Sequence, residues 1–174
     1  MEAGTSTAPA AAIDMQALTC CFGDLVAVDS LTLRIPSGVI FGLLGSNGAG
    51  KSTVIKMLTT LLPPTAGSAT VAGYDIGKDP LEVRRHIGYV SQMLSADGEL
   101  SGYENLLISA KLYRIPRAER ALRIGQALAF MQMETAADRL VSHYSGGMIR
   151  RLEIAQAMLH RPPVLFLDEP TVGL

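Results

Sequence analysis

The sequence predicts an α/β fold with a mainly parallel core sheet, an antiparallel β-subdomain near the N-terminus and an α-helical subdomain. Two apolar runs, residues 39–44 and 164–167, have the near-continuous hydrophobicity of strands that are covered on both faces. Shorter strand-like segments with turns between them surround the first run. Between residues 93 and 147 strand signals are few and helix signals replace them, which predicts a helical insertion.

Composition limits the classes of protein to consider. The 174 residues are 48% apolar and 18% charged, which is typical of a globular chain. The net charge of −1 argues against a dedicated nucleic-acid binder, which normally carries a basic face. No apolar run approaches the roughly 18 residues of a membrane span. Cys20 and Cys21 are neighbours in an expected strand and should point to opposite faces, which suits neither a zinc site nor a disulfide.

The expected elements follow from periodicity and from residues that stop helices. Strands are expected at residues 15–21, 31–35, 39–44, 68–74, 87–91 and 164–167. Helices are expected at residues 51–62, 80–86, 101–114 and 116–133, and a last one begins at Gly146-Gly147. Ser101 and Glu104 have the spacing of a capping box, and Pro116 fits the first turn of the helix after it.

The loop after residues 39–44 matches the pattern G-x-x-x-x-G-K-[ST] in full. Glycines let successive backbone N–H groups turn toward an anion, and the N-terminus of the following helix adds partial positive charge. Lys51 can reach the β- and γ-phosphates, and the Ser52 hydroxyl can ligate Mg²⁺. The predicted ATP-binding residues here are Gly45, Ser46, Asn47, Gly48, Ala49, Gly50, Lys51, Ser52 and Thr53. The alternative is an ordinary glycine-rich turn, which the flanking strand and helix disfavour.

The second apolar run ends in two carboxylates, Asp168 and Glu169. Such a strand places negative charge at the carboxyl edge of a parallel sheet, where ligands bind in these folds. Asp168 can hold Mg²⁺ from the side opposite Ser52, and Glu169 is placed to orient or deprotonate the attacking water. Many strands simply end in an acidic turn, so the interpretation depends on the phosphate loop upstream.

Ser145-Gly146-Gly147 opens a helix just before that strand. The order of phosphate loop, helical segment, Ser-Gly-Gly helix and Asp-Glu strand resembles the nucleotide-binding domain of ABC-transporter ATPases, which has a P-loop NTPase core. Residues 45–53 match Walker A, Gln92 the Q-loop, 144–148 the signature loop and 165–169 Walker B. The resemblance covers residues 14–174. Finer similarity at residues 41–45, 59–62, 144–148 and 150–152 is to bacterial drug-export ATPases of the daunorubicin-resistance type.

The resemblance implies ATP and Mg²⁺ as cofactors and assigns further roles. Phe22 stands where an aromatic ring stacks on adenine, although a strand-end phenylalanine is as compatible with the core. Gln92 resembles the residue that touches Mg²⁺ or the attacking water and reports the nucleotide state to a membrane subunit. By resemblance, the catalytic residues are Glu169, Gln92 and Lys51, and the metal ligands are Ser52, Gln92 and Asp168.

The signature loop implies a partner. In the family, Ser145, Gly146 and Gly147 would bind the γ-phosphate of ATP held by a second copy, which gives a head-to-tail homodimer with two equivalent sites. The implied function is the ATPase subunit of an exporter, peripheral on the cytoplasmic side of the membrane, which drives a drug-like or antibiotic-like compound through a separate permease of the ABC-2 type. The alternatives are a soluble ABC-type ATPase acting on ribosomes or DNA, and an inactive fragment. No nucleic-acid partner is expected.

Two features depart from the family pattern. Tyr144 and Met148 replace the usual leucine and glutamine beside Ser-Gly-Gly, and we expect the γ-phosphate contact to survive. The sequence stops at Leu174, before the family's D-loop aspartate, H-loop histidine and next strand. Residues 39–44 and 164–167 would then each keep an unpaired ladder edge. We therefore expect an incomplete fold at the C-terminus, and a chain that is unstable or aggregation-prone and hydrolyses ATP poorly.

The expected organisation has four parts. Residues 1–13 are expected to be a flexible tail, because they are rich in small residues and lack the features of a secretory signal. Residues 14–92 form the β-subdomain with the Walker A core, and residues 93–147 the helical subdomain that ends at the signature loop. Residues 148–174 return to the core and carry Walker B.

Overall fold

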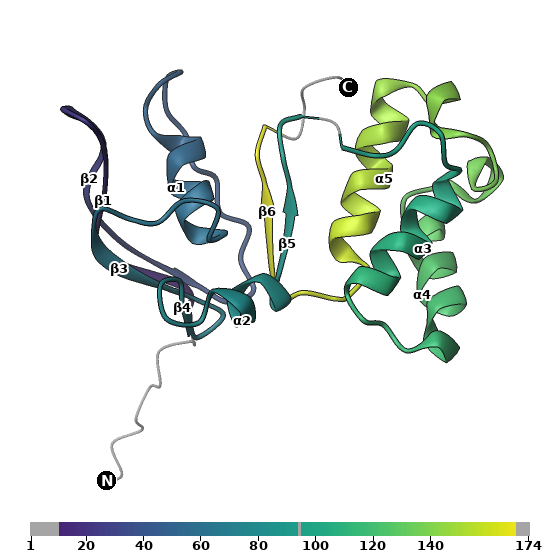
Figure 1. Cartoon of the computed structure of the whole chain (residues 1–174), viewed down its shortest axis with the longest axis horizontal. Coiled ribbons are helices and arrows are strands. Elements are labelled where there is room, and N and C mark those ends of the chain that lie inside the picture. Colours follow the sequence, from purple (N-terminus) through teal and green to yellow (C-terminus); the bar gives the residue numbers. More distant parts are fainter. Residues whose placement is uncertain (1–10, 94, 170–174) are drawn as a thin grey trace, which may run out of the picture. The chain divides into compact units, whose positions relative to one another are not determined.

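The structure, a computed structural model, describes residues 11–93 and 95–169 (Figure 1). The chain divides into two compact units, one up to His86 and one from Ile87 onward. The division comes before the strand that leads to Gln92, whereas the sequence placed a boundary after Gln92. Strand β1 begins at Ala11, so residues 11–13 belong to the sheet and not to the expected tail. Residues 1–10 of that tail and the segment after Glu169 lie outside the described residues.

The first unit is built on a four-stranded antiparallel sheet with the order β2-β1-β3-β4. Its strands are β1 (Ala11–Phe22), β2 (Leu25–Pro36), β3 (Ala66–Val71) and β4 (Tyr74–Asp75). The first two strands are longer than expected because a tight turn joins them, with Phe22 paired to Leu25 and Gly23 at φ +58°. The antiparallel β-subdomain predicted from the sequence is confirmed.

The central strand β1 changes its buried face at Ala17. Met15 is buried before this point and Leu18 and Cys20 after it, so the simple alternation of a strand is broken once. Ala17 has φ +48°, and the register against β2 shifts between Met15 and Leu18, which is a β-bulge. Beyond the bulge the alternation resumes: Cys20 is buried, Cys21 is half-buried, and both are free thiols. This difference in exposure fits the expectation of opposite faces, which stays a prediction because the register against β2 shifts again between the two cysteines.

Helix α1 (Lys51–Leu58) packs on the sheet through Val54, Met57 and Leu58. It ends four residues before the expected position at 62, for a local reason. Thr60 has φ +62°, its N–H donates to the Met57 carbonyl, and the N–H of Leu61 donates to the Lys56 carbonyl. This is a Schellman ending with threonine in the position that glycine usually takes. The unit closes with the short helix α2 (Pro80–Arg85).

Residues 39–44 form no strand, and the prediction of a buried core strand there was wrong. Within the described ranges they have no ladder partner, and Ile40 and Leu44 are almost fully exposed. A strand is stabilised by its neighbours, since each N–H and C=O needs a partner across the ladder. The strand was predicted from hydrophobicity alone, and no described strand pairs with residues 39–44.

The second unit contains a two-stranded parallel sheet of β5 (Ile87–Val90) and β6 (Val164–Leu167). The register places Tyr89 opposite Phe166. Gly88 lets helix α5 approach β5, because a Cβ there would overlap the carbonyl of Ala157. In β6 only Phe166 is buried, so the cover on both faces that its apolar sequence predicted is not observed.

Three helices form the rest of the second unit: α3 (Gly102–Leu112), α4 (Arg117–Phe130) and α5 (Gly146–Met158) (Figure 1). Two 3-10 turns, Glu134–Ala136 and Val141–His143, connect α4 to α5. The capping box at Ser101 and Glu104 is confirmed in both directions, and Pro116 is the N-cap of α4. These elements enclose one hydrophobic core, made by Leu106, Ala110, Ile115, Ile124, Leu128, Met133, Ala136, Ala137, Val141, Tyr144, Leu152, Ala155 and Leu159. The predicted helical subdomain is confirmed.

Candidate functional site

The glycine-rich loop, residues 45–50, combines two left-handed glycines with the start of a helix. Gly48 and Gly50 both have φ +82°, a conformation that residues with a Cβ rarely adopt. Gly50 is the N-cap of α1, which begins at Lys51. The first turn of α1 contains no acidic residue, so its partial positive charge is not compensated by a side chain of that turn. A phosphate at this position would meet backbone N–H groups and a helix N-terminus together.

The Lys51 side chain lies along the same loop. Its Nζ donates hydrogen bonds to the carbonyl oxygens of Gly45, at 2.7 Å, and Ser46, at 2.8 Å. The ammonium group is therefore held against the first two residues of the loop. Ser52 follows on the first turn of α1 and is half-buried. The residues present fit a nucleotide phosphate chain with a divalent cation, because they offer amides, one cation and a hydroxyl oxygen.

Gly50 also anchors the loop to the antiparallel sheet. A Cβ at this position would overlap the carbonyl oxygen of Ala27 and come within 3.2 Å of Val28 Cγ2, both on β2. Only a residue without a side chain allows this approach. The β1–β2 hairpin therefore determines where the loop turns into α1.

Replacing Gly50 with alanine is expected to destabilise the chain by about 2–4 kcal/mol, through positive-φ strain and the overlap with Ala27. Gly48→Ala is the matched control, because Gly48 has the same φ of +82° but nothing within 4 Å of a Cβ. Its expected cost is the strain alone, about 1–2 kcal/mol. Thermal or urea unfolding of both variants measures the difference. Equal costs would show that the approach to β2 is not needed.

Phe22 lies at the end of β1, next to the hairpin turn. Its side chain is 51% exposed, which excludes a core role. The ring is thus available to stack on a planar group, although its use for adenine stays a prediction.

Gln92 and Glu169 meet in the second unit. Gln92 follows β5 and Glu169 follows β6, and the parallel pairing of these strands brings both to one edge although they are 77 residues apart. Gln92 Nε2 donates to Glu169 Oε2 at 2.9 Å. Glu169 has φ +49°, a left-handed conformation that costs about 1–3 kcal/mol for a non-glycine residue.

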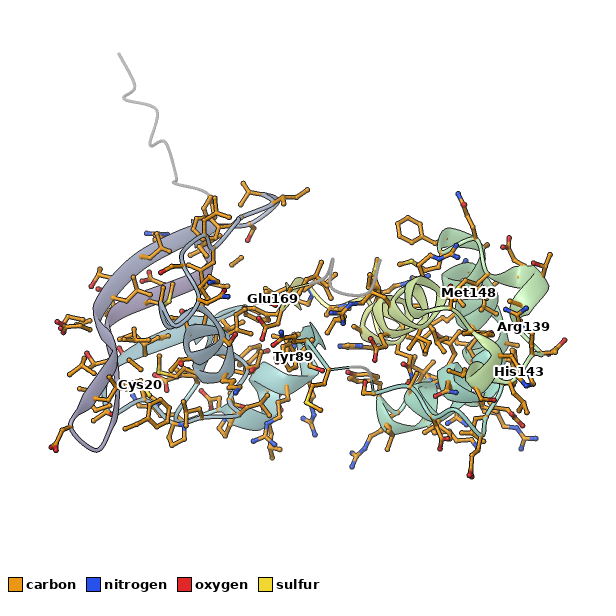
Figure 2. The ribbon with its side chains drawn as sticks, turned by 90° about the horizontal axis from the view of Figure 1, so that it is seen from above. Cys20, Tyr89, Arg139, His143, Met148 and Glu169 are labelled. Carbon is orange, nitrogen blue, oxygen red and sulfur yellow. The ribbon has the colours of Figure 1, made fainter. Side chains whose placement is uncertain are left out.

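Asp168 lies between β6 and Glu169 and is buried. Its backbone N–H donates to the carbonyl of Val90 at 3.0 Å, which extends the β5–β6 ladder by one residue and fixes its position. Burial raises the pKa of the nearby Tyr89 hydroxyl, and the negative charge of Asp168 raises it further. Tyr89 is therefore a neutral phenol beside this carboxylate at physiological pH. Figure 2 shows Tyr89 and Glu169 in this part of the second unit.

The signature loop opens helix α5. Ser145 is the N-cap, and its hydroxyl accepts a hydrogen bond from the Met148 N–H at 3.3 Å. Gly146 and Gly147 form the first turn and have no side chains, so the helix N-terminus stays accessible to an anion. This position fits the predicted contact with a γ-phosphate, which stays a prediction.

The two departures from the usual signature sequence have structural roles. Tyr144 is buried and its hydroxyl donates to the Ala136 carbonyl at 2.6 Å. The guanidinium of Arg139 lies over the Tyr144 ring, at 5.2 Å from its centre, and donates to Met148 Sδ at 3.2 Å. Figure 2 shows Arg139 and Met148 in this region. Tyr144 and Met148 therefore hold the signature loop in place through their contacts with Arg139 and the Ala136 carbonyl. The sequence did not predict these contacts.

Sequence reasoning also missed two buried charged residues, Arg150 and Glu153. They lie three residues apart on α5 and form an ion pair at 3.3 Å. The available signal was an arginine and a glutamate with i, i+3 spacing next to the apolar face of the helix.

The predicted site residues fall into two groups, one in each compact unit. The loop 45–53 and Phe22 belong to the first unit, whereas Gln92, Ser145–Gly147, Asp168 and Glu169 belong to the second.

Comparison with known proteins decides the family. The profile of the family described as "ABC transporter" matches residues 28–172, which is most of the chain. The chain belongs to the ABC transporter family.

Individual ABC proteins resemble it closely. The chain is 44% identical over 169 residues to the daunorubicin/doxorubicin resistance ATP-binding protein DrrA of Streptomyces peucetius, a match that covers 97% of this chain and 51% of DrrA. It is 42% identical over 174 residues to the Nod factor export ATP-binding protein I of Neorhizobium galegae, covering 100% of this chain and 50% of that protein. The chain thus spans about half the length of these curated relatives.

Solved structures confirm the fold class. A structure described as the ATP-binding subunit of an ABC transporter superposes with a TM-score of 0.83 at 30% identity, covering 93% of this chain and 68% of that one. The α/β fold with an antiparallel β-subdomain and a helical subdomain is therefore the fold of ABC ATPase domains. None of the helices in residues 11–93 and 95–169 is both long enough and apolar enough to cross a bilayer.

Proposed function

We propose that this chain is the ATP-binding and ATP-hydrolysing part of an ABC exporter subunit. The proposal rests on the phosphate loop, in which two glycines at φ +82°, the N-terminus of α1 and the ammonium of Lys51 occur within seven consecutive residues, 45–51. These groups match the negative charge and the acceptor oxygens of a triphosphate. The names of the relatives, which are ATP-binding proteins of drug resistance and export, support the same function.

The residues divide the work of hydrolysis between binding and water activation. The loop amides and Lys51 hold the β- and γ-phosphates, and the aromatic ring of Phe22 supports the base. Ser52, Gln92 and Asp168 offer the oxygen ligands that Mg²⁺ prefers. When bound, Mg²⁺ neutralises charge that develops on the phosphate oxygens. Glu169 orients or deprotonates the attacking water, and its hydrogen bond to Gln92 keeps the carboxylate in one orientation.

The subunit is proposed to act as a head-to-tail homodimer at the cytoplasmic side of the membrane. Ser145, Gly146 and Gly147 of one copy then bind the γ-phosphate held by the other, with α5 presenting its N-terminus to the anion. ATP binding closes the dimer and hydrolysis reopens it, which drives export through a separate permease, for which we propose the ABC-2 type. Drug-like or antibiotic-like compounds are the proposed cargo.

Two measurements test this function. A fluorescent ATP analogue titrated against the purified chain, with and without Mg²⁺, is expected to bind in a saturable manner and more tightly with Mg²⁺. The complete protein, expressed with the genes beside its own, is expected to co-purify with a membrane permease. Co-sedimentation with ribosomes or DNA in place of a permease would contradict the transport function, and absence of saturable ATP binding would contradict the proposal as a whole.

A further inference from the structure

Arg150 on α5 is among the most buried side chains of the described residues, with 1% of its surface exposed. Burying a guanidinium is unfavourable unless its N–H groups meet acceptors. A position on the exposed side of the helix would avoid this cost. The contacts of Arg150 therefore indicate what its burial achieves.

Those contacts are with the two segments that carry the proposed water-activating residues. Arg150 Nη1 donates to the carbonyl of Ser91 at 2.6 Å, and Ser91 immediately precedes Gln92. Arg150 Nη2 donates to the carbonyl of Glu169 at 3.1 Å. One planar group thus bonds the segments that follow β5 and β6 at the same time through two different nitrogens, an arrangement that suits the fork geometry of arginine.

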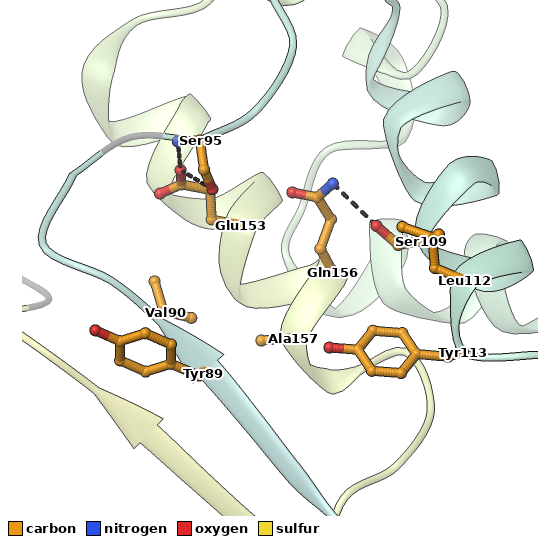
Figure 3. A pocket seen from close by; sticks show the side chains of 9 residues that line it. All are labelled: Tyr89, Val90, Ser95, Ser109, Leu112, Tyr113, Glu153, Gln156 and Ala157. Atoms are coloured by element: carbon orange, nitrogen blue, oxygen red, sulfur yellow. Dashed lines mark hydrogen bonds between the residues drawn. The ribbon is translucent and has the colours of Figure 1, made fainter. Parts of the chain in front are cut away.

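Glu153 completes the arrangement one turn further along α5. It is 5% exposed, and its Oε2 accepts from Arg150 Nη1 at 3.3 Å. Its Oε1 accepts from the backbone N–H of Ser95 and, at 3.1 Å, from the Ser95 hydroxyl. Figure 3 shows Ser95 and Glu153 with these bonds, at the edge of a cavity of about 350 Å³. The segment that carries Gln92 is therefore held at Ser91 on one side and at Ser95 on the other.

We propose that Arg150 and Glu153 are positioning residues for ATP hydrolysis. They hold Gln92 and Glu169 in their hydrogen-bonded arrangement and connect that arrangement to α5, whose N-terminus is the signature loop. This inference rests on the proposed ATPase function.

The test uses the double variant Arg150→Met/Glu153→Gln in the complete protein. Both changes conserve side-chain volume, neither leaves an unpaired buried charge, and glutamine can still accept from Ser95. The expected result is an unfolding midpoint and a KM for ATP close to those of the parent. The expected kcat is about ten- to a hundredfold lower. Displacing Gln92 and Glu169 weakens interactions made in the transition state, whereas the binding of ATP in the ground state is unchanged.

Arg151→Met is the matched control. Arg151 is the next residue on the same helix, and its Nη1 donates to the carbonyl of Met131 at 3.2 Å, away from Gln92 and Glu169. Its kcat is expected to equal that of the parent.

Arg150→Lys provides a second test that keeps the charge opposite Glu153, and it is expected to lower kcat with KM unchanged. If the folded double variant has the kcat of the parent, the positioning role is overturned. If the double variant does not fold, a parental kcat in Arg150→Lys overturns it.

The same experiment separates this inference from the function on which it rests. If the parent protein shows no Mg²⁺-dependent ATPase activity, the proposed function fails and the positioning role fails with it. If the parent is active and the folded Arg150 variants are equally active, only the positioning role fails.

Discussion

Lys51→Ala is expected to weaken ATP binding by about a hundredfold or more, because a charge-assisted contact to phosphate of about 3 kcal/mol is lost. The Lys51 ammonium donates to the carbonyl oxygens of Gly45 and Ser46. The fold should tolerate the change, since both carbonyls belong to exposed residues and water can replace the ammonium. Anisotropy of a fluorescent ATP analogue gives the dissociation constant directly.

Lys56→Ala is the control for this loss of charge. Lys56 lies on the same helix, five residues beyond Lys51, is exposed and occupies the last turn. Its removal should change the dissociation constant by less than about twofold, since an exposed charge that makes no contact with the phosphates contributes little in water. Equal affinity of Lys51→Ala and the parent would refute the phosphate loop as the binding element, and the ATPase function with it.

Glu169→Gln is expected to keep nucleotide affinity and to lower turnover of the complete protein by about a hundredfold or more, which is the contribution of a general base. Glutamine has the same shape, and its amide oxygen can still accept from Gln92 Nε2, so the local geometry is retained. Only the ability to take a proton is lost. ATP should then persist in the closed dimer, and gel filtration with ATP should show the dimer where the parent shows monomer.

Single-turnover phosphate release checks the rate, with Glu134→Gln as control. Glu134 is an exposed carboxylate in the 3-10 turn after α4, and its replacement should leave turnover unchanged. Undiminished turnover in Glu169→Gln would remove Glu169 from the catalytic role while leaving the phosphate loop untouched.

Local signals predicted much of this structure. The capping box at Ser101 and Glu104 and the Ser145 N-cap are interactions within one helical turn, so a short stretch of sequence contains all their partners. The glycines of the phosphate loop are likewise visible in a short stretch of sequence, whereas the close approach of Gly50 to Ala27 on β2 is not. The Gln92–Glu169 contact is not local, and only family resemblance placed these residues in one site before the structure joined them at 2.9 Å.

The misses have a common physical origin. The apolar run at residues 39–44 indicated burial, but a strand exists only where another strand pairs with it, and the run does not encode that partner. Arg150 was not assigned a role because a charged residue on a helix normally faces water. Its actual acceptors, the carbonyls of Ser91 and Glu169, are backbone atoms that no residue type reveals. Likewise, the β-bulge at Ala17 leaves no composition signal.

The exposed ring of Phe22 has a consequence for nucleotide choice. A phenyl group provides a flat apolar face and neither a donor nor an acceptor, so it responds to the planarity of a base and not to its exocyclic groups. On the proposal that this ring supports the base, adenine and guanine nucleotides would gain about the same free energy from it. Preference for one purine over the other would then have to come from polar contacts elsewhere, while the triphosphate chain supplies the affinity that both share.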